Sequence, residues 1–290
     1  MRTEQEMMDL ILNVANQDER IRAVAMNGSR TNPNAPIDPF QDYDIVYLVS
    51  EMDSFLQDPD WVDVFGERII MQTPENMSLF PPSLGGRFTY LMLFADGNRI
   101  DLMLVPISEK DAYCQEDQLT VILLDKDHVM PEVAPPSDAD YWVKRPSAAY
   151  YADCCNEFWW VSTYVAKGLW RSEILYAMDH LNKVMRPMLI QMLEWQVGTQ
   201  TDFSVSAGKN GKYLQNYMSE QSWEALLFTF PAGNYDEVWR ALFTICDLFR
   251  STSRFVADHF GFEYPRQEDE RVSAYLKHVS SLPAEAKEIY

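Results

Sequence analysis

Cysteine, histidine and positive charge are scarce in this 290-residue sequence, and each scarcity argues against a class of protein. The four cysteines form no C-x-x-C pair, and Cys154 and Cys155 are adjacent, so a disulfide framework is not expected. The four histidines lie far apart without metal-ligand spacing, which argues against zinc. The sequence has no apolar run of membrane-spanning length and no signal-peptide pattern at its amino terminus. We therefore expect a reduced, cytoplasmic protein that is not bound to a membrane.

The charge balance narrows the choice of partner. Acidic residues outnumber basic ones by 44 to 24, which gives a formal net charge of −20. Nucleic-acid-binding proteins normally carry a basic surface, so we expect no nucleic-acid partner. An acidic field attracts a cationic substrate and raises its rate of association, although many proteins are acidic only for solubility. The charge favours a cationic ligand without identifying it.

The chain is predicted to contain two domains. With 47% apolar residues it can bury a sizeable core, and its length suits two ordinary domains. A capping box at residues 3–6 precedes an opening helix, and strand-like runs follow as far as residues 121–124. The segment 130–138 has the composition of a linker. We predict an α+β fold: a mixed sheet with flanking helices over residues 1–134, followed by an all-helical domain over residues 135–290.

Helical periodicity dominates the second half, where seven of the eight tryptophans lie. One helix is predicted from about residue 147 to 169, and a second from 173 to 197 with a kink at Pro187. The last long helix is predicted over residues 238–260, because its apolar residues keep to one face.

A glycine turn and two nearby carboxylates suggest a phosphate-binding site. Gly28, Ser29 and Arg30 follow an apolar run of strand length, and a glycine at such a turn lets the backbone approach a phosphate. Asp42 and Asp44 begin the next strand-like run, at residues 43–49. Side chains alternate between the faces of a strand, so both carboxylates point the same way. They repel each other unless a cation lies between them.

A third acid, Asp101, lies in an otherwise apolar strand of a predicted hairpin, at residues 87–94 and 99–105. A lone carboxylate is costly to bury in such a strand. If this strand lies beside the one that carries Asp42 and Asp44, the three carboxylates converge. Hard oxygen ligands of this kind suit Mg²⁺, which commonly binds through carboxylates and substrate phosphates.

Taken together, the Gly-Ser turn, the Asp-x-Asp pair and the later strand acid resemble the polymerase-β type nucleotidyltransferase superfamily. Further matches resemble the bacterial aminoglycoside 6-adenylyltransferases, and these cover segments 27–32, 41–45, 99–102, 166–171 and 208–214. The resemblance implies transfer of AMP from ATP to the 6-hydroxyl of streptomycin, with two Mg²⁺ ions and release of pyrophosphate. It implies that Asp42 and Asp44 are metal ligands, and that Asp101 is either a third ligand or the general base.

Six positions are candidates for binding ATP. Ser29 and the amides around Gly28 are expected to hold the β- and γ-phosphates, and Arg30 to add charge to that contact. By resemblance, Lys167, Lys209 and Lys212 are also phosphate-binding candidates, the last two in a loop expected to open a helix. This loop is no Walker motif, because a tyrosine follows Lys212 where serine or threonine is required. Solvated surface lysines are the alternative interpretation.

The helix predicted at residues 147–169 offers a candidate acceptor-binding face. Asp153, Glu157, Trp160 and Tyr164 are spaced by four, three and four residues, so they share one side. Carboxylates interleaved with aromatic rings suit a polycationic sugar. The alternative is an ordinary exposed helix face.

Two other functions remain open at this point. The acceptor hydroxyl could belong to another aminoglycoside, a lincosamide-like drug or a protein. Alternatively, the chain could be a catalytically idle nucleotide-binding module that recruits a partner, although the repelling carboxylates argue against this. We expect a monomer.

Overall fold

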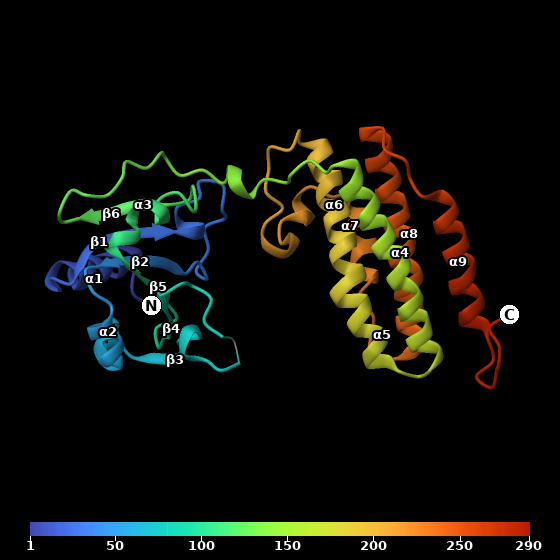
Figure 1. Ribbon diagram of the computed structural model, residues 1–290, viewed down its shortest axis with the longest axis horizontal. Helices are drawn as coiled ribbons and strands as arrows, with labels where there is room; N and C mark the ends of the chain where they lie inside the picture. Colours follow the sequence, from blue (N-terminus) through green and yellow to red (C-terminus); the bar gives the residue numbers. More distant parts are fainter. Residues whose placement is uncertain (80) are drawn as a thin grey trace. The chain divides into compact units, whose positions relative to one another are not determined.

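The computed structural model of the protein describes residues 1–79 and 81–290, and it divides into two compact units. Unit 1 comprises Met1–Asp140 and unit 2 comprises Tyr141–Tyr290 (Figure 1). The division falls a few residues after the boundary predicted at residue 134. Each unit has its own hydrophobic core, and the two are described separately.

Unit 1 is built on a six-stranded mixed sheet in the order β3-β4-β5-β2-β1-β6. All neighbouring strands are antiparallel except β2 and β5, which are parallel. The strands are β1 Ile21–Asn27, β2 Tyr43–Val49, β3 Arg68–Gln72, β4 Phe88–Phe94, β5 Arg99–Pro106 and β6 Val121–Asp125. The predicted hairpin at residues 87–105 is therefore confirmed, and its second strand lies beside β2.

Helix α1 (Glu4–Gln17) covers one face of this sheet. The predicted capping box is present: the Thr3 side chain accepts a hydrogen bond from the Glu6 amide, and the Glu6 side chain accepts one from the Thr3 amide. The apolar residues of α1 pack on Tyr43, Ile45 and Tyr47 of β2, all of which are buried. The shorter helices α2 (Asp53–Gln57) and α3 (Lys110–Tyr113) also belong to this unit.

The opposite face of the sheet carries the carboxylates. Because β2 exposes alternate side chains on alternate faces, burial of Tyr43 and Ile45 under α1 turns Asp44 to the other side. The parallel register of β2 and β5 pairs Asp44 with Asp101. Within the described residues of unit 1, a small apolar cluster, centred on residues of β1, β2 and α3, lies on this face. The sheet thus brings two acids from distant segments together on its less covered side.

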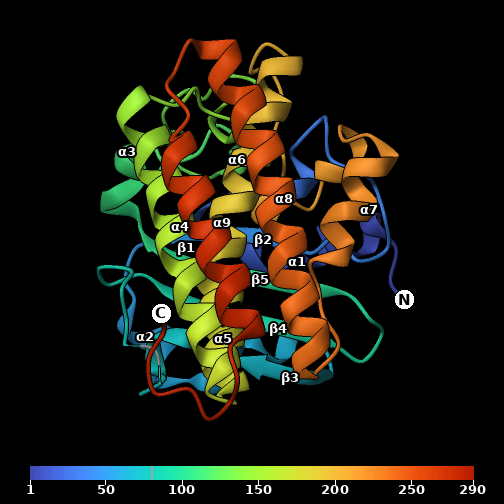
Figure 2. The ribbon, with the colours of Figure 1, turned by 90° about the vertical axis from the view of Figure 1, so that its right-hand side faces the viewer.

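Unit 2 is helical, as predicted from residue 135 onward. Its main helices are α4 Ala148–Trp170, α5 Ile174–His180, α6 Arg186–Gln200, α7 Glu220–Phe228, α8 Tyr235–Phe260 and α9 Arg266–Ser281. Figure 2 shows α4, α8 and α9 running alongside one another, and α4 contacts α5, α6, α8 and α9. The stacked rings of Phe158 and Phe249, 3.7 Å apart, join α4 to α8 in the core.

The kink predicted at Pro187 takes the form of a π-helical turn, Leu181–Met185, between α5 and α6. Proline has no amide hydrogen to donate, so the regular helical bonding pattern is interrupted in the preceding turn. At the junction, the buried Arg186 donates to the hydroxyl and carbonyl oxygens of Thr229 at 2.6 and 2.8 Å. Its pKa is lowered to about 10 because burial disfavours the charged form.

Two details of the predicted organisation were wrong. The helix over residues 238–260 exists as α8 but is not the last long one, because the 16-residue α9 follows it. The loop 208–212 opens no α-helix; it forms a short 3₁₀ turn at Lys209–Gly211, and the next α-helix begins only at Glu220.

The four cysteines are free thiols. Within the described ranges, no helix is both long and apolar enough to span a membrane.

Candidate functional site

Three carboxylates meet at the end of β2 and the start of β5. Asp42, Asp44 and Asp101 each present an oxygen, and the three oxygens lie within 4.8 Å of one another. This is the one group of potential metal ligands found in the described part of the chain. Asp42 and Asp101 are 29% and 19% exposed, so the cluster is open to a ligand from solvent. The structure therefore brings together all three acids that the sequence singled out.

Asp44 is the most deeply placed of the three. Its pKa is raised to about 7, first by burial and then by the negative charges of Asp42 and Asp101. No hydrogen bond to its side chain is recorded among the described residues. A divalent cation placed between the carboxylates would remove the repulsion that raises this pKa. The oxygen donor set and its geometry fit a hard cation such as Mg²⁺.

Gly28 lies directly against Asp44. Its φ angle is +75°, and a Cβ atom at this position would lie 1.9 Å from Oδ2 of Asp44. Glycine is therefore required here for two reasons: the backbone is left-handed, and a side chain would collide with Asp44. The absent side chain leaves the carboxylate of Asp44 packed against the backbone of the turn.

Ser29 and Arg30 continue this turn in different ways. The Ser29 hydroxyl has no recorded hydrogen-bond partner within the described residues, so it is free to bind a ligand. Arg30 instead donates to the carbonyl oxygens of Asp42 and Gln41 at 3.0 and 2.9 Å, and its guanidinium stacks 3.8 Å from the centre of the Tyr43 ring. Its side chain is only 12% exposed. Arg30 thus holds the backbone that carries Asp42.

Arg99 supplies the positive charge nearest to the cluster. It donates two hydrogen bonds to the carboxylate of Asp101, at 2.7 and 2.6 Å, and lies 3.8 Å from Asp42. At 47% exposed, this side chain can swing away without unpacking the core. Arg99 thus compensates part of the negative charge of the cluster, and a cation bound there would take over this role.

A cavity of about 370 Å³ adjoins Asp44 and Asp101 on the same face of the sheet. Asn27, Tyr113 and Asp117 are among the residues that line it. The Tyr113 hydroxyl donates to Oδ1 of Asn27 at 2.5 Å, which fixes the end of β1 beside the cavity. Space for a substrate therefore exists next to the carboxylates within unit 1.

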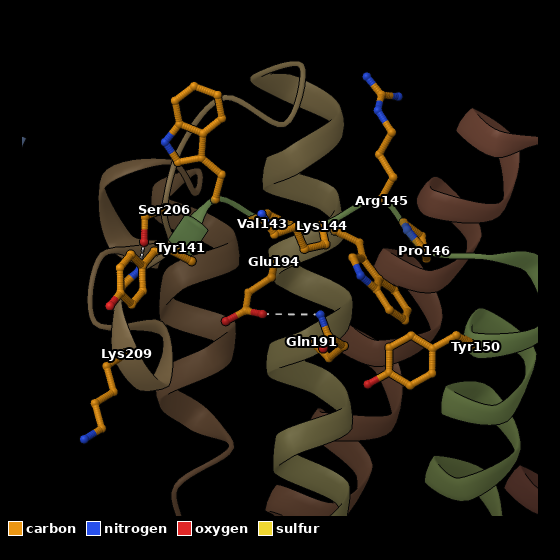
Figure 3. A pocket seen from close by; sticks show the side chains of 14 residues that line it. Tyr141, Val143, Lys144, Arg145, Pro146, Tyr150, Gln191, Glu194, Ser206 and Lys209 are labelled. Carbon is orange, nitrogen blue, oxygen red and sulfur yellow. Dashed lines mark hydrogen bonds between the residues drawn. The ribbon is translucent and has the colours of Figure 1, made fainter. Parts of the chain in front are cut away.

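The three lysines predicted to bind phosphate lie in unit 2, in different surroundings. Lys167, in the last turn of α4, places its Nζ 4.6 Å from the centre of the Tyr164 ring and 5.7 Å from that of Tyr176. Lys212 packs over Tyr213 at 5.0 Å. Lys209 lines a separate pocket, shown in Figure 3. Their role in binding phosphate stays a prediction.

The predicted acceptor face of α4 is present as a surface. Asp153, Glu157 and Trp160 are exposed, while the apolar residues on the other side of α4 are buried. The indole of Trp160 donates to the Tyr164 hydroxyl at 2.8 Å. Because Lys167 already lies over the Tyr164 ring, a cationic ligand at that ring would compete with it. Binding of an acceptor to this face stays a prediction.

Comparison with known proteins identifies the family to which the chain belongs. The family model described as streptomycin adenylyltransferase matches residues 1–279. The chain belongs to this family. It is therefore a nucleotidyltransferase, and the superfamily expected from the Gly-Ser turn and the three acids is confirmed.

Individual relatives match along nearly the whole chain. The aminoglycoside 6-adenylyltransferase of Bacillus subtilis strain 168 is 49% identical over 96% of this chain and 98% of its own length. That of Campylobacter jejuni is 45% identical over 95% of both chains. The crystal structure of an aminoglycoside 6-adenyltransferase from Bacillus subtilis is 44% identical, covers 97% of this chain and 100% of that chain, and gives a TM-score of 0.49.

Sequence reasoning missed two features of this nucleotidyltransferase. Arg99 lies within the matching segment 99–102, but the sequence assigns it no role, and only the structure shows its bonds to Asp101. Nor did the sequence indicate that the donors of Arg30 reach the backbone carbonyls of Asp42 and Gln41, and its contact with phosphate stays a prediction. A sequence signal existed for the first, since residues two apart on a strand share a face. No comparable sequence signal indicated the contacts of Arg30.

Proposed function

We propose that the protein transfers AMP from ATP to the 6-hydroxyl of streptomycin in a Mg²⁺-dependent reaction that releases pyrophosphate. The observation that supports this most directly is the convergence of Asp42, Asp44 and Asp101 beside the Gly28 turn, in a chain of the streptomycin adenylyltransferase family. The product would be an adenylylated antibiotic whose added phosphate alters its charge and shape.

Asp42 and Asp44 would hold the metal, because their oxygens converge and their mutual repulsion is relieved by a cation. Mg²⁺, expected as two ions, would supply charge neutralisation for the triphosphate and for the leaving pyrophosphate. Gly28 and Ser29 offer the adjacent turn, where backbone amides and a free hydroxyl suit phosphate oxygens. Arg30 contributes by fixing the backbone of Asp42.

The transfer itself is an in-line displacement. The acceptor hydroxyl oxygen forms a bond to the α-phosphorus of ATP, and the bond from that phosphorus to the β-phosphate bridging oxygen breaks. Pyrophosphate takes the electron pair, and the hydroxyl proton passes to Asp101 or, if Asp101 is a metal ligand, to water. The residues of the site act mainly by placing these groups in line and by stabilising charge.

Asp101 can serve as a third ligand or as the proton acceptor, and the two roles predict different behaviour of Asp101→Asn. Loss of a ligand raises the Mg²⁺ concentration needed for half-maximal activity. Loss of a base lowers kcat at every Mg²⁺ concentration and removes an acidic limb from the pH–rate profile. Measurement of activity against Mg²⁺ and pH separates these outcomes.

The proposal of streptomycin as the acceptor rests on the net charge of the protein and on the names of its relatives. The relatives are named as aminoglycoside 6-adenylyltransferases, and the net charge of −20 favours a cationic acceptor. The test is pyrophosphate release from ATP and Mg²⁺ with streptomycin, with other aminoglycosides and without acceptor, followed by mass spectrometry of the product. An AMP adduct on streptomycin supports the proposal. Release with a different acceptor only, or with none, contradicts it.

A further inference from the structure

A pocket of about 430 Å³ lies within unit 2, between the middle of α6, the segment 141–146 and the loop 206–209. The backbone amide of Val143 donates to the carbonyl of Val205 at 3.0 Å, which joins the two non-helical walls. Figure 3 shows Glu194 and Gln191, one helical turn apart on α6, at the floor of this pocket. No role was assigned to either residue from the sequence.

Glu194 is a partly buried carboxylate with too few partners. Its recorded hydrogen bond comes from the neutral amide of Gln191, at a long 3.3 Å. No basic side chain of the described residues lies within ion-pairing distance of it. Burial raises the pKa of Glu194, and no nearby cation offsets this effect. A carboxylate held in this way has unused capacity to accept hydrogen bonds from a cationic ligand.

Three basic residues, Lys144, Arg145 and Lys209, also line the pocket, and none of them forms an ion pair with Glu194. Arg145 forms an ion pair with Asp202 at 2.6 Å and lies over the Phe203 ring at 4.4 Å. Figure 3 shows the side chains of Arg145 and Lys209 extending away from Glu194. Glu194 is therefore left without a cationic partner among the described residues, although basic side chains line the same pocket.

Aromatic rings complete the floor. Tyr150 and Trp195 line the pocket and meet edge to face, with their ring centres 5.5 Å apart. Trp195 is buried, whereas Tyr150 is 53% exposed and offers a ring face to a ligand. A planar guanidinium can stack on such a face while its N–H groups pair with a carboxylate in two parallel hydrogen bonds. The carboxylate of Glu194, the amide oxygen of Gln191 and the aromatic face of Tyr150 together suit a guanidinium group.

We propose that this pocket binds a guanidinium group of the aminoglycoside acceptor, with Glu194 as its charge partner and Gln191 as a second acceptor. The inference rests on the proposed function, since it takes streptomycin, which carries guanidinium groups, as the acceptor. It moves the main acceptor contact from the exposed acids of α4 to Glu194. On the α4 face, Lys167 already lies over the Tyr164 ring, where a cationic ligand would have to compete with it.

The test compares Glu194→Gln with Glu224→Gln. Both variants remove one negative charge, but Glu224 is an exposed residue of α7 outside the pocket, so it controls for the overall field of the protein. Streptomycin and ATP–Mg²⁺ binding are measured separately by calorimetry, and KM and kcat by pyrophosphate release. Loss of a charge-assisted contact should raise the streptomycin Kd and KM of Glu194→Gln about 10- to 100-fold. ATP–Mg²⁺ affinity and kcat should change less than about twofold, as in the control variant.

Three results would overturn the inference. Unchanged streptomycin affinity in Glu194→Gln would remove the pocket from the acceptor site. Weaker ATP–Mg²⁺ binding with unchanged streptomycin binding would assign the pocket to the adenine amino group instead. Equal weakening in Glu194→Gln and Glu224→Gln would show a general effect of charge. Failure of the wild-type protein to bind or modify streptomycin is a separate outcome, which would contradict the proposed function itself.

Discussion

Replacement of Gly28 by alanine tests the contact between the glycine turn and the carboxylate cluster. The added methyl group would lie 1.9 Å from Oδ2 of Asp44. Carbon and oxygen atoms do not approach so closely, so the carboxylate must retreat by about 1 Å, and a displacement of this size at a reacting centre can cost about 100-fold in rate. The φ angle of +75° adds a backbone penalty of about 1 kcal/mol for any residue with a Cβ atom.

Two measurements on Gly28→Ala are needed, because the clash and the backbone strain have different consequences. Thermal or denaturant unfolding should show a loss of about 1–2 kcal/mol, which reports mainly the strain. Streptomycin-dependent pyrophosphate release should fall about 100-fold, which reports the displaced Asp44. The Mg²⁺ concentration for half-maximal activity should also rise, because a metal ligand has moved.

Gly261→Ala is the matched control. Gly261 caps α8 with a φ angle of +69°, and a Cβ atom there would meet nothing within 4 Å. This variant should show a similar loss of stability with kcat close to that of the wild type. If Gly28→Ala loses no more activity than Gly261→Ala, the reasoning that Gly28 positions Asp44 is refuted.

Three further predictions follow from individual contacts. Asp96→Asn should lower the free energy of unfolding at pH 7 by about 2 kcal/mol, because Asp96 accepts charged hydrogen bonds from Arg2. Arg2 lowers the pKa of Asp96, so its contribution is present above pH 4 or so and lost as the pH falls below that value; a destabilisation that persists undiminished at pH 2 would contradict this. Arg30→Gln should raise the Mg²⁺ concentration for half-maximal activity about tenfold while the KM for ATP at saturating Mg²⁺ is unchanged; the reverse pattern would identify Arg30 as a phosphate ligand. Glu157→Gln should weaken streptomycin binding, measured by calorimetry, by less than Glu194→Gln does, and leave ATP affinity intact; unchanged streptomycin affinity would remove the α4 face from the acceptor site.

The carboxylate cluster could be predicted from sequence because it depends on simple regularities. Alternation along β2 places Asp44 opposite Tyr43 and Ile45, whose apolar character identifies the covered face. The placement of Asp101 beside Asp44 required one further assumption, that the hairpin strand pairs with β2, and the structure bears this out. Elements with strong periodicity, such as α4 and α8, were predicted to within a few residues for the same reason.

Other features depend on chain paths that no local pattern encodes. Arg30 reaches the carbonyls of Gln41 and Asp42 only because the intervening loop returns to it. Glu194 is a single acid on α6, and it becomes part of a pocket only when the loop 206–209 folds back beside it. Helix α9 was overlooked because it is largely polar, with few apolar residues such as Leu276 and Val279 buried against the rest of unit 2.

Pyrophosphate release from ATP and Mg²⁺ by wild-type protein and by Asp44→Asn is the most direct test of the central claim, that the three carboxylates carry out metal-dependent AMP transfer to streptomycin. Circular dichroism and thermal unfolding confirm that the variant is folded. The account predicts release that depends on streptomycin in the wild type and falls by at least about 100-fold in Asp44→Asn. Release that persists in the folded variant, or that is independent of both streptomycin and Mg²⁺ in the wild type, would contradict this claim.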